Sequence, residues 1–291
     1  MKIGHFEFNE PIPDIKESHV IAVLRPWIDV GGVGTLTLSR LERHLRAREI
    51  GRLSSPGRFY DFTRYRPRSL MNEGKREFNV PNTIIRHAEM AEGPDLLLVH
   101  LLEPHLYGEE YVETMLEVFE YLGVKKYSLI GAMYDMVPHT RPLIVSGVGV
   151  GLGADEENSN MNVKSSNYEG PTTITYLIGQ GVAKKGIDTR IYVVHLPQYF
   201  QVEEDLSGTS RLMEILCRLY SLPDRLIESD RGRDQYESLQ KMFEEESEVS
   251  SLLLRLEEKY DKDNEQSDIS LGPLSQDIEE FLRGLDEGPS S

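Results

Sequence analysis

A glycine-rich turn near the amino terminus constrains the fold more than any other feature of this chain. Residues 20–24 (VIAVL) are continuously apolar, residues 25–34 read RPWIDVGGVG, and Leu38, Leu41 and Leu45 then recur at helical spacing. Strand, glycine turn and helix form the repeating unit of open α/β sheets, and such a turn lies at the carboxyl end of its strand. We therefore expect an α/β protein with a pocket or interface at this turn.

The turn supplies the first candidate residues for a pocket or interface. They are an aromatic ring, a carboxylate and three glycines: Trp27, Asp29, Gly31, Gly32 and Gly34. A helix amino terminus offers unpaired N–H groups and a partial positive charge. Glycine lets the backbone bend sharply and lets a ligand or another chain approach closely.

Further apolar runs and helical patterns alternate along the first part of the chain. Strands are predicted over 96–102, 127–133, 143–148 and 190–195, and helices over 109–122 and 172–184. Continuous apolarity suits strands that are covered on both faces. Strands alternating with helices indicate βαβ units. Residues 59–62 (FYDF) predict a shorter antiparallel strand, so we expect a three-layer α/β/α sandwich with a mixed, mostly parallel sheet.

The composition changes near residue 222. From residue 225 onward the chain has 19 Asp and Glu against 8 Lys and Arg, so this part carries −11 of the total charge of −17. We predict an α/β/α domain over residues 1–222, an acidic helical extension over 223–285 and a disordered tail over 286–291.

A heptad-like pattern runs through the acidic extension. The apolar positions are Leu239, Met242, Val249, Leu253, Leu256 and Tyr260, with Glu246 interrupting them. The pattern indicates a coiled coil or a helical hairpin. Packing on the chain's own domain and packing between subunits both remain open. Residues 261–272 are predicted to be a linker, and residues 274–285 a last short helix.

Composition excludes several classes of protein. With 291 residues, 39% of them hydrophobic, the chain can bury a full core. Its net charge of −17 argues against nucleic acid as a partner. The one cysteine, Cys217, falls in a helical pattern and predicts an inert buried thiol in a reducing cytoplasm. No apolar stretch is long enough to span a membrane, and residues 1–7 do not read as a signal peptide.

Two motifs resemble ligand sites but favour other structures. Residues 147–154 (GVGVGLGA) match a dinucleotide fingerprint, yet the acidic, turn-forming residues 155–160 follow, so we expect a flexible loop. His100, Glu103 and His105 have metal-capable side chains at the end of a predicted strand. Strand and turn spacing rarely makes three such neighbours converge. We therefore predict no metal and no cofactor.

The remaining polar candidates follow later strands. His195, Asp135 and His139 could supply acid–base pairs, although no G-x-S-x-G motif accompanies them. Residues 138–142 (PHTRP) form a proline-stiffened loop. This loop presents Arg141 to a carboxylate or phosphate, or Arg141 fixes the loop through backbone carbonyls.

Seven short motifs in order resemble the proteasome assembly chaperone family of the second type, PAC-two, in its prokaryotic branch. They are residues 27–34 (WIDVGGVG), 59–62 (FYDF), 65–67 (YRP), 103–104 (EP), 138–142 (PHTRP), 168–171 (YEGP) and 195–199 (HLPQY). The likeness covers about residues 15–222. It implies a nucleoside-phosphorylase-like sandwich, homo-oligomers that are commonly trimers, and proteasome subunits as possible protein partners.

Two hypotheses about function follow. The leading one is a cytoplasmic, non-catalytic interaction protein of assembly-chaperone type, with His139, Arg141, His195 and Tyr199 joining the glycine turn in a pocket or interface. The alternative is an enzyme with a phosphorylase-like or ATP-grasp-like small-molecule site. In that enzyme the glycine turn would bind an anion, Arg141 would clamp it, and His139 or His195 would act as acid or base.

Overall fold

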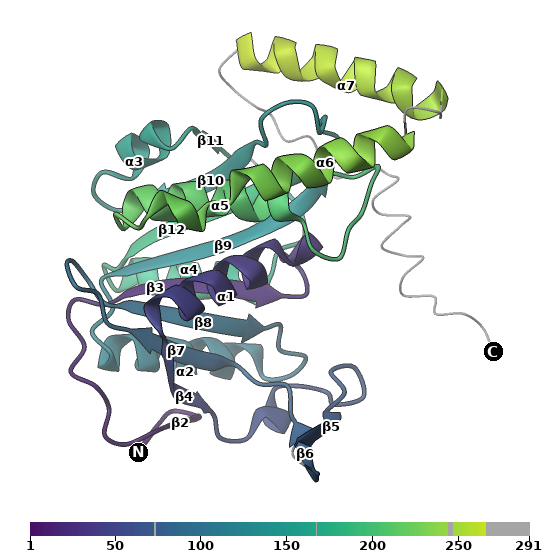
Figure 1. Ribbon diagram of the computed structural model, residues 1–291. Helices are drawn as coiled ribbons and strands as arrows, with labels where there is room; N and C mark the ends of the chain where they lie inside the picture. The colour runs from purple at the N-terminus through teal and green to yellow at the C-terminus, as the bar shows by residue number, and fades with distance from the viewer. Residues whose placement is uncertain (73, 167, 244–246, 266–291) are drawn as a thin grey trace.

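Helices cover both faces of one large sheet in the computed structural model, which describes residues 1–72, 74–166, 168–243 and 247–265 (Figure 1). The sheet runs in the order β1-β2-β4-β7-β8-β3-β9-β12-β10-β11. In that order its strands are β1 (Lys2–Ile3), β2 (Phe6–Phe8), β4 (Arg48–Leu53), β7 (Ile84–Ala88), β8 (Leu96–Leu102), β3 (His19–Arg25), β9 (Lys126–Asp135), β12 (Asp188–Pro197), β10 (Val145–Val150) and β11 (Val163–Ser165).

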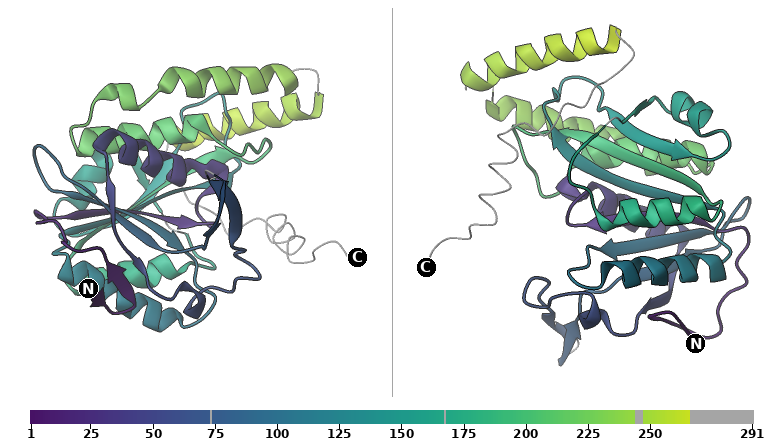
Figure 2. Two further views of the ribbon diagram at one scale, coloured as in Figure 1. Left: turned by 60° about the horizontal axis from the view of Figure 1, so that its bottom comes forward. Right: turned by 180° about the vertical axis from the view of Figure 1, so that it is seen from behind.

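Different helices cover the two faces of the sheet (Figure 2). Helices α1 (Val33–Leu45) and α5 (Leu206–Leu219) pack on one face, and α2 (Gly108–Tyr121) and α4 (Ile174–Lys184) on the other. The remaining helices are α3 (Ala154–Asn160), α6 (Ser229–Phe243) and α7 (Ser247–Glu265), with 3₁₀ turns η1 (Val30–Gly32), η2 (Pro56–Arg58) and η3 (Asp224–Leu226). The predicted α/β/α sandwich is confirmed.

Continuous apolarity makes β3 a central strand because both of its faces are buried. Val20 and Leu24 belong to the core under α2 and α4, whereas Ile21 and Val23 belong to the core under α1 and α5. Successive side chains of a strand point to opposite faces. A run without polar residues therefore fits only a strand that has a helix layer on each side.

The mixed sheet is confirmed, but its antiparallel part is larger than the sequence indicated. Strands β8, β3, β9 and β12 are parallel neighbours, with ten residue pairs between β9 and β12. By contrast, one side of the sheet is antiparallel. There each strand pairs with the next in the spatial order β1, β2, β4, β7 and β8. The chain from Ala88 to Leu96 is too short for a crossover, so β7 must run against β8.

Two local predictions were wrong. Residues 59–62 are not a strand but follow η2, because Phe59 is buried by edge-on packing against Tyr111, with 5.3 Å between ring centroids, rather than by strand pairing. The flexible loop predicted at residues 147–154 is wrong in part, because residues 147–150 belong to β10, and the turn-forming residues 155–160 lie in helix α3. There the Glu157 carboxylate accepts hydrogen bonds from Lys126 and Arg190, and these bonds tie the helix to the sheet.

A small hairpin stands apart from the main sheet. Strands β5 (Arg68–Asn72) and β6 (Lys75–Asn79) pair only with each other, and all ten of their residues are exposed (Figure 1). Leu70, Met71 and Phe78 are 50%, 65% and 69% exposed. An isolated two-stranded hairpin is marginally stable in water, and apolar side chains in the open favour contact with another molecule.

The acidic extension is helical as far as the structure describes it. Helices α6 and α7 carry the predicted heptad-like pattern, and α7 continues to Glu265, so the first residues of the predicted linker 261–272 are helical. Polar residues there extend the solvent face of a surface helix. The predicted helix over 274–285 and the predicted tail over 286–291 lie outside the described residues. The domain boundary at residue 222 stays a prediction.

Candidate functional site

The carboxyl edge of the central sheet carries an exposed apolar surface. Strands β8, β3 and β9 are parallel neighbours, so the loops that follow them emerge side by side. These loops carry Trp27, Leu106, Tyr107 and Met136, which are 56%, 53%, 55% and 39% exposed. We call these four residues the carboxyl-edge surface. Bands of exposed large apolar side chains mark interaction sites more often than a single exposed residue does.

The Asp29 carboxylate occupies the position at the amino terminus of α1 where the glycine turn was predicted to bind an anion. Its carboxylate accepts hydrogen bonds from the backbone N–H and the hydroxyl of Thr35, in the first turn of α1. Burial raises the pKa of Asp29, and these bonds oppose that rise. The amino terminus of α1 therefore already holds a carboxylate from its own chain.

The glycines of the turn make room for the segment that begins α5. Gly31 has a φ of 58°, and a Cβ there would lie 2.7 Å from the Asp205 Cβ. The Gly31 carbonyl accepts a hydrogen bond of 2.8 Å from the Asp205 N–H. At Gly34 a Cβ would lie 2.5 Å from Val23, so this glycine lets α1 approach β3. The segment that closely approaches this turn is therefore another part of the same chain, the start of α5.

His139 and Tyr199 meet in an aromatic cluster beside α6. The Tyr199 hydroxyl accepts a 2.9 Å hydrogen bond from the His139 N–H, and the same hydroxyl lies 2.5 Å from the ring nitrogen Nδ1. The His139 ring packs edge-on against Phe200 and Tyr236, at centroid distances of 5.5 and 6.3 Å. Burial lowers the pKa of His139 below its ordinary value. A neutral imidazole is the form that such an apolar environment favours.

Arg141 binds carboxylates of the acidic extension. Its Nε and Nη2 donate to the two carboxylate oxygens of Asp261 over 2.9 Å each, and Nη1 lies 3.1 Å from Glu257 Oε1. These carboxylates belong to the same chain, so the role predicted from the sequence, binding a ligand's carboxylate or phosphate, stays a prediction. The two Asp261 bonds form the side-on pairing that the planar guanidinium favours.

His195 forms a hydrogen-bonded chain with Asp135, whose side chain is 31% exposed, and with the buried Ser146. His195 Nδ1 lies 2.7 Å from Asp135 Oδ2, and Nε2 lies 2.7 Å from Ser146 Oγ. His195 is 1% exposed and Ser146 5%. Burial is the largest single influence and acts to raise the pKa of Asp135, but the hydrogen bond and electrostatic attraction of His195, the Met136 N–H and Lys259 together outweigh it, so this pKa is lowered. A carboxylate that orients an imidazole toward a hydroxyl is the arrangement of hydrolytic triads, here in a closed position.

The structure therefore brings part of the predicted set together, because Tyr236 packs on His139 and donates to Asp205, which contacts Gly31. The other contacts form separate groups. The turn glycines contact the start of α5, His139 joins Tyr199, Arg141 contacts α7, and His195 lies in its own chain. The sequence did not reveal the partners that complete these groups: Ser146, Asp205, Tyr236, Glu257 and Asp261. The apolar residues around Tyr236 gave a helical signal, but no local signal marked the others.

The possible metal ligands diverge. His100 Nε2 lies 2.5 Å from Glu42, Glu103 accepts from the Ile174 N–H, and His105 Nδ1 accepts from the Asp61 N–H. Within the described part of the chain, no cluster of three His, Cys, Asp or Glu side chains suits a metal ion. Nor does any helix there have the length and apolarity to cross a membrane.

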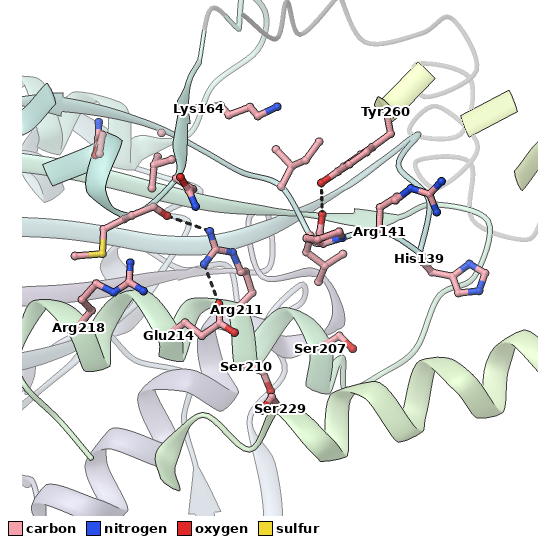
Figure 3. A pocket seen from close by; sticks show the side chains of 18 of the residues that line it. His139, Arg141, Lys164, Ser207, Ser210, Arg211, Glu214, Arg218, Ser229 and Tyr260 are labelled. Carbon is pink, nitrogen blue, oxygen red and sulfur yellow. Dashed lines mark hydrogen bonds and ion pairs between the residues drawn. The ribbon is translucent and has the colours of Figure 1, made fainter. Parts of the chain in front are cut away.

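A cleft of about 1340 Å³ opens between α5 and α6 on one side and β10 and β11 on the other (Figure 3). His139 and Arg141 lie at one end of it, and Tyr260 of α7 donates a hydrogen bond of 2.9 Å to the Pro142 carbonyl there. The side chains of Arg211 and Arg218 reach into it from α5. The predicted residues His139 and Arg141 thus lie on the wall of a cleft that is open to solvent.

Comparison with known proteins places these features in a family. The PAC2 family model matches residues 23–234. A protein of unknown function from Corynebacterium glutamicum is 21% identical, with a TM-score of 0.79 over 90% of this chain and 98% of that one. A PAC2 family protein from Streptomyces avermitilis is 25% identical, with a TM-score of 0.71 over 81% and 99%.

A proteasome-assembly chaperone homologue from Mycobacterium tuberculosis is 21% identical, with a TM-score of 0.70 over 80% of this chain and 99% of that one. No curated protein matches the chain. At this level of identity the solved structures establish the fold, which agrees with the three-layer sandwich described above.

Proposed function

Since this chain belongs to the PAC2 family, we propose that it is a protein-binding, assembly-chaperone-like protein that acts through its surfaces. The carboxyl-edge surface carries the proposal. Trp27 and Tyr107 are more than half exposed on adjacent loops, and a large aromatic ring that a partner covers contributes strongly to binding. The relative from Mycobacterium tuberculosis, a proteasome-assembly chaperone homologue by name, supports proteasome subunits as the partner class.

Binding to purified proteasome subunits from the source organism tests this function. The double substitution Trp27→Ser/Met136→Ser should weaken that binding by about tenfold or more, because it removes two apolar contacts from the carboxyl-edge surface. Leu254→Ser is the matched control, since Leu254 is 63% exposed on α7 and lies outside this surface. Equal binding by both variants, or no binding by the wild type, would reject the proposal.

We further propose a cytoplasmic homo-oligomer, with a trimer as the expected state and residues 1–222 as its α/β/α domain. The exposed hairpin β5–β6 supports self-association, because Met71 and Phe78 would lose water contact in an interface. Light scattering should give three times the chain mass at about 50 μM, and Met71→Ser/Phe78→Ser should lower it. A strict monomer in the wild type contradicts this part of the proposal.

The chain of Asp135, His195 and Ser146 favours an enzyme as the second candidate function. Its two contacts of 2.7 Å match the arrangement in which an imidazole activates a serine hydroxyl. A fluorophosphonate probe that labels Ser146, with labelling lost in His195→Gln, would support that function. We expect no labelling, because Ser146 is 5% exposed and its strand pairs with β12 at Val193.

A further inference from the structure

We propose that the end of the cleft at Arg141 is a binding site for acidic peptide segments that carry two carboxylates one helical turn apart. Helix α7 then occupies this site in the isolated chain, and a partner segment of the same chemistry exchanges with it. The inference goes beyond the assembly-chaperone function and does not depend on which protein partner that function uses.

The contacts of Arg141 define what the site binds. Asp261 accepts two parallel hydrogen bonds of 2.9 Å from Nε and Nη2, and Glu257 lies 3.1 Å from Nη1, so one guanidinium holds two carboxylates. Positions 257 and 261 are four residues apart in α7 and therefore share one face of the helix. We call these contacts the Arg141 latch. A ligand must therefore match the spacing of these two carboxylates as well as their charge.

The segment around Arg141 adds contacts that favour a helix as the ligand. The Thr140 hydroxyl donates to Glu257, and the Pro142 carbonyl accepts a hydrogen bond from the Tyr260 hydroxyl. Three consecutive residues of the rigid loop 138–142 thus contact one face of α7 over a single turn. A rigid loop loses little conformational freedom when its ligand binds.

More basic than acidic side chains line the cleft, although Arg211 is paired with Glu214, and Arg233 with Asp230 and Glu237. Five basic side chains line it against three acidic ones, in a chain whose net charge is −17. The basic residues are Arg141, Lys164, Arg211, Arg218 and Arg233, and the acidic ones are Asp155, Glu214 and Glu237. A cleft of local positive charge attracts an acidic segment even to an acidic protein, and salt weakens that attraction.

Three residues that line the cleft, His139, Asn158 and Ser210, each carry a buried polar atom without a hydrogen-bond partner among the described residues. Ser210 is 6% exposed and lines the cleft from α5, and its hydroxyl has no hydrogen-bond partner among the described residues. Figure 3 shows its side chain on the α5 wall, toward α6. Buried hydroxyls in folded proteins are generally hydrogen-bonded.

The Arg141 latch is exchangeable because water reaches both of its sides. The Arg141 side chain is 32% exposed, and that of Asp261 is 55% exposed. Water screens an exposed ion pair, so each contact of the latch is weak, although α7 competes from the same chain and therefore at a high effective concentration. The apparent affinity for an added peptide is then reduced by the fraction of molecules in which α7 occupies the site.

Fluorescence anisotropy with the full chain tests the proposal. The probe is a labelled, alanine-based helical peptide of about 16 residues with two Glu residues four positions apart. Glu257→Gln/Asp261→Asn opens the latch and should tighten binding by about tenfold. Adding Arg141→Gln to that variant should abolish the gain. The matched control is Glu113→Gln/Glu258→Gln, which removes two exposed carboxylates that do not contact Arg141 and should leave the affinity unchanged.

A second peptide and a small anion complete the test. The same peptide with Gln in place of both Glu residues should bind at least about tenfold more weakly, since it offers the guanidinium no carboxylate. Circular dichroism verifies that each variant is folded. Binding that ignores Arg141 or the carboxylate spacing would overturn the proposal. So would citrate binding at Arg141 under conditions in which the acidic peptide does not bind.

Discussion

Helices α6 and α7 both belong to the acidic extension, yet they are attached to the sandwich by different kinds of contact. Tyr236 of α6 is 7% exposed, packs on Phe200 at 5.1 Å and donates a hydrogen bond of 2.9 Å to Asp205. Helix α7 buries Leu256, which is 5% exposed, and is otherwise attached largely through the partly exposed carboxylates of Glu257 and Asp261. Buried aromatic packing and a buried hydrogen bond hold α6, whereas partly exposed ion pairs supply much of the attachment of α7, so we infer that α7 is the more easily released of the two helices.

The contrast shows that composition does not tell which part of an acidic extension is structural. Gly232 illustrates the reason: a Cβ at this position of α6 would lie 2.8 Å from the Ser207 Cα, so the helix backbones of α6 and α5 nearly touch. Such contact depends on one small residue and leaves no trace in the net charge.

Asp205→Ala should have the largest effect, because Asp205 joins the sandwich to α6. Its carboxylate accepts from the Gly208 N–H at the start of α5 and from the Tyr236 hydroxyl, and it is 1% exposed. Losing the cap and leaving a buried hydroxyl unpaired should lower the free energy of unfolding by about 3 kcal/mol. Urea denaturation measures the change.

The control for this variant is Asp230→Ala, which removes an 81% exposed carboxylate from the first turn of α6. It should change the free energy of unfolding by less than about 0.5 kcal/mol. If the two variants behave alike, Asp205 does not connect α6 to the core.

Gly232→Ala should have the next largest effect. The new methyl group would lie within 3.0 Å of three Ser207 atoms, so α6 must move away from α5. We expect a loss of about 1–2 kcal/mol in the free energy of unfolding. Gly179→Ala in α4 is the matched control, because its Cβ would meet nothing closer than 3.8 Å. That change should stabilise the protein by about 0.5–1 kcal/mol through helix propensity.

Acid should weaken the sandwich before it releases α7. Burial, and then the nearby Lys126, lower the pKa of His19 from 6.5 to about 4. The unfolded state therefore binds more protons between these values, and stability should fall as pH drops from about 6.5 toward 4. Urea midpoints at several pH values should show this slope, and His19→Gln should flatten it. If His19→Gln leaves the slope unchanged, titratable groups other than His19 cause the pH dependence.

The Arg141 latch should respond at lower pH. The hydrogen bond from Arg141 lowers the pKa of Asp261 below its ordinary 3.8, so the latch is intact above that value and is lost as pH falls through the lowered pKa. Asp261→Asn should therefore leave the urea midpoint nearly unchanged while speeding hydrogen exchange in α7. A large drop in the midpoint would mean that α7 is part of the cooperative fold.

Much of the sandwich was predictable because its signals are local. The runs at 20–24 and 96–102 are central strands, as expected of apolar segments that are buried on both faces. The strand predicted at residues 59–62 was wrong because the apolar character of Phe59 and Tyr60 reflects side-chain packing rather than strand pairing. The hairpin β5–β6 was missed because its residues are largely polar and exposed on both faces.

The sequence identified single residues of the candidate site but not the residues that they contact. His195 and Asp135 were recognised as acid–base candidates, but Ser146 joins them through the register of β10 against β12. Arg141 meets Asp261 across 120 positions of sequence, and nothing local separates Asp261 from the other acids of the extension. Pairings of this kind are set by tertiary packing.

Hydrogen–deuterium exchange of the full chain at about 0.05 M and 0.5 M salt tests the central comparison most directly. The account predicts that the amides of α7 exchange faster than those of α6, and that added salt speeds exchange in α7 alone. Equal protection of the two helices, unchanged by salt, would contradict it.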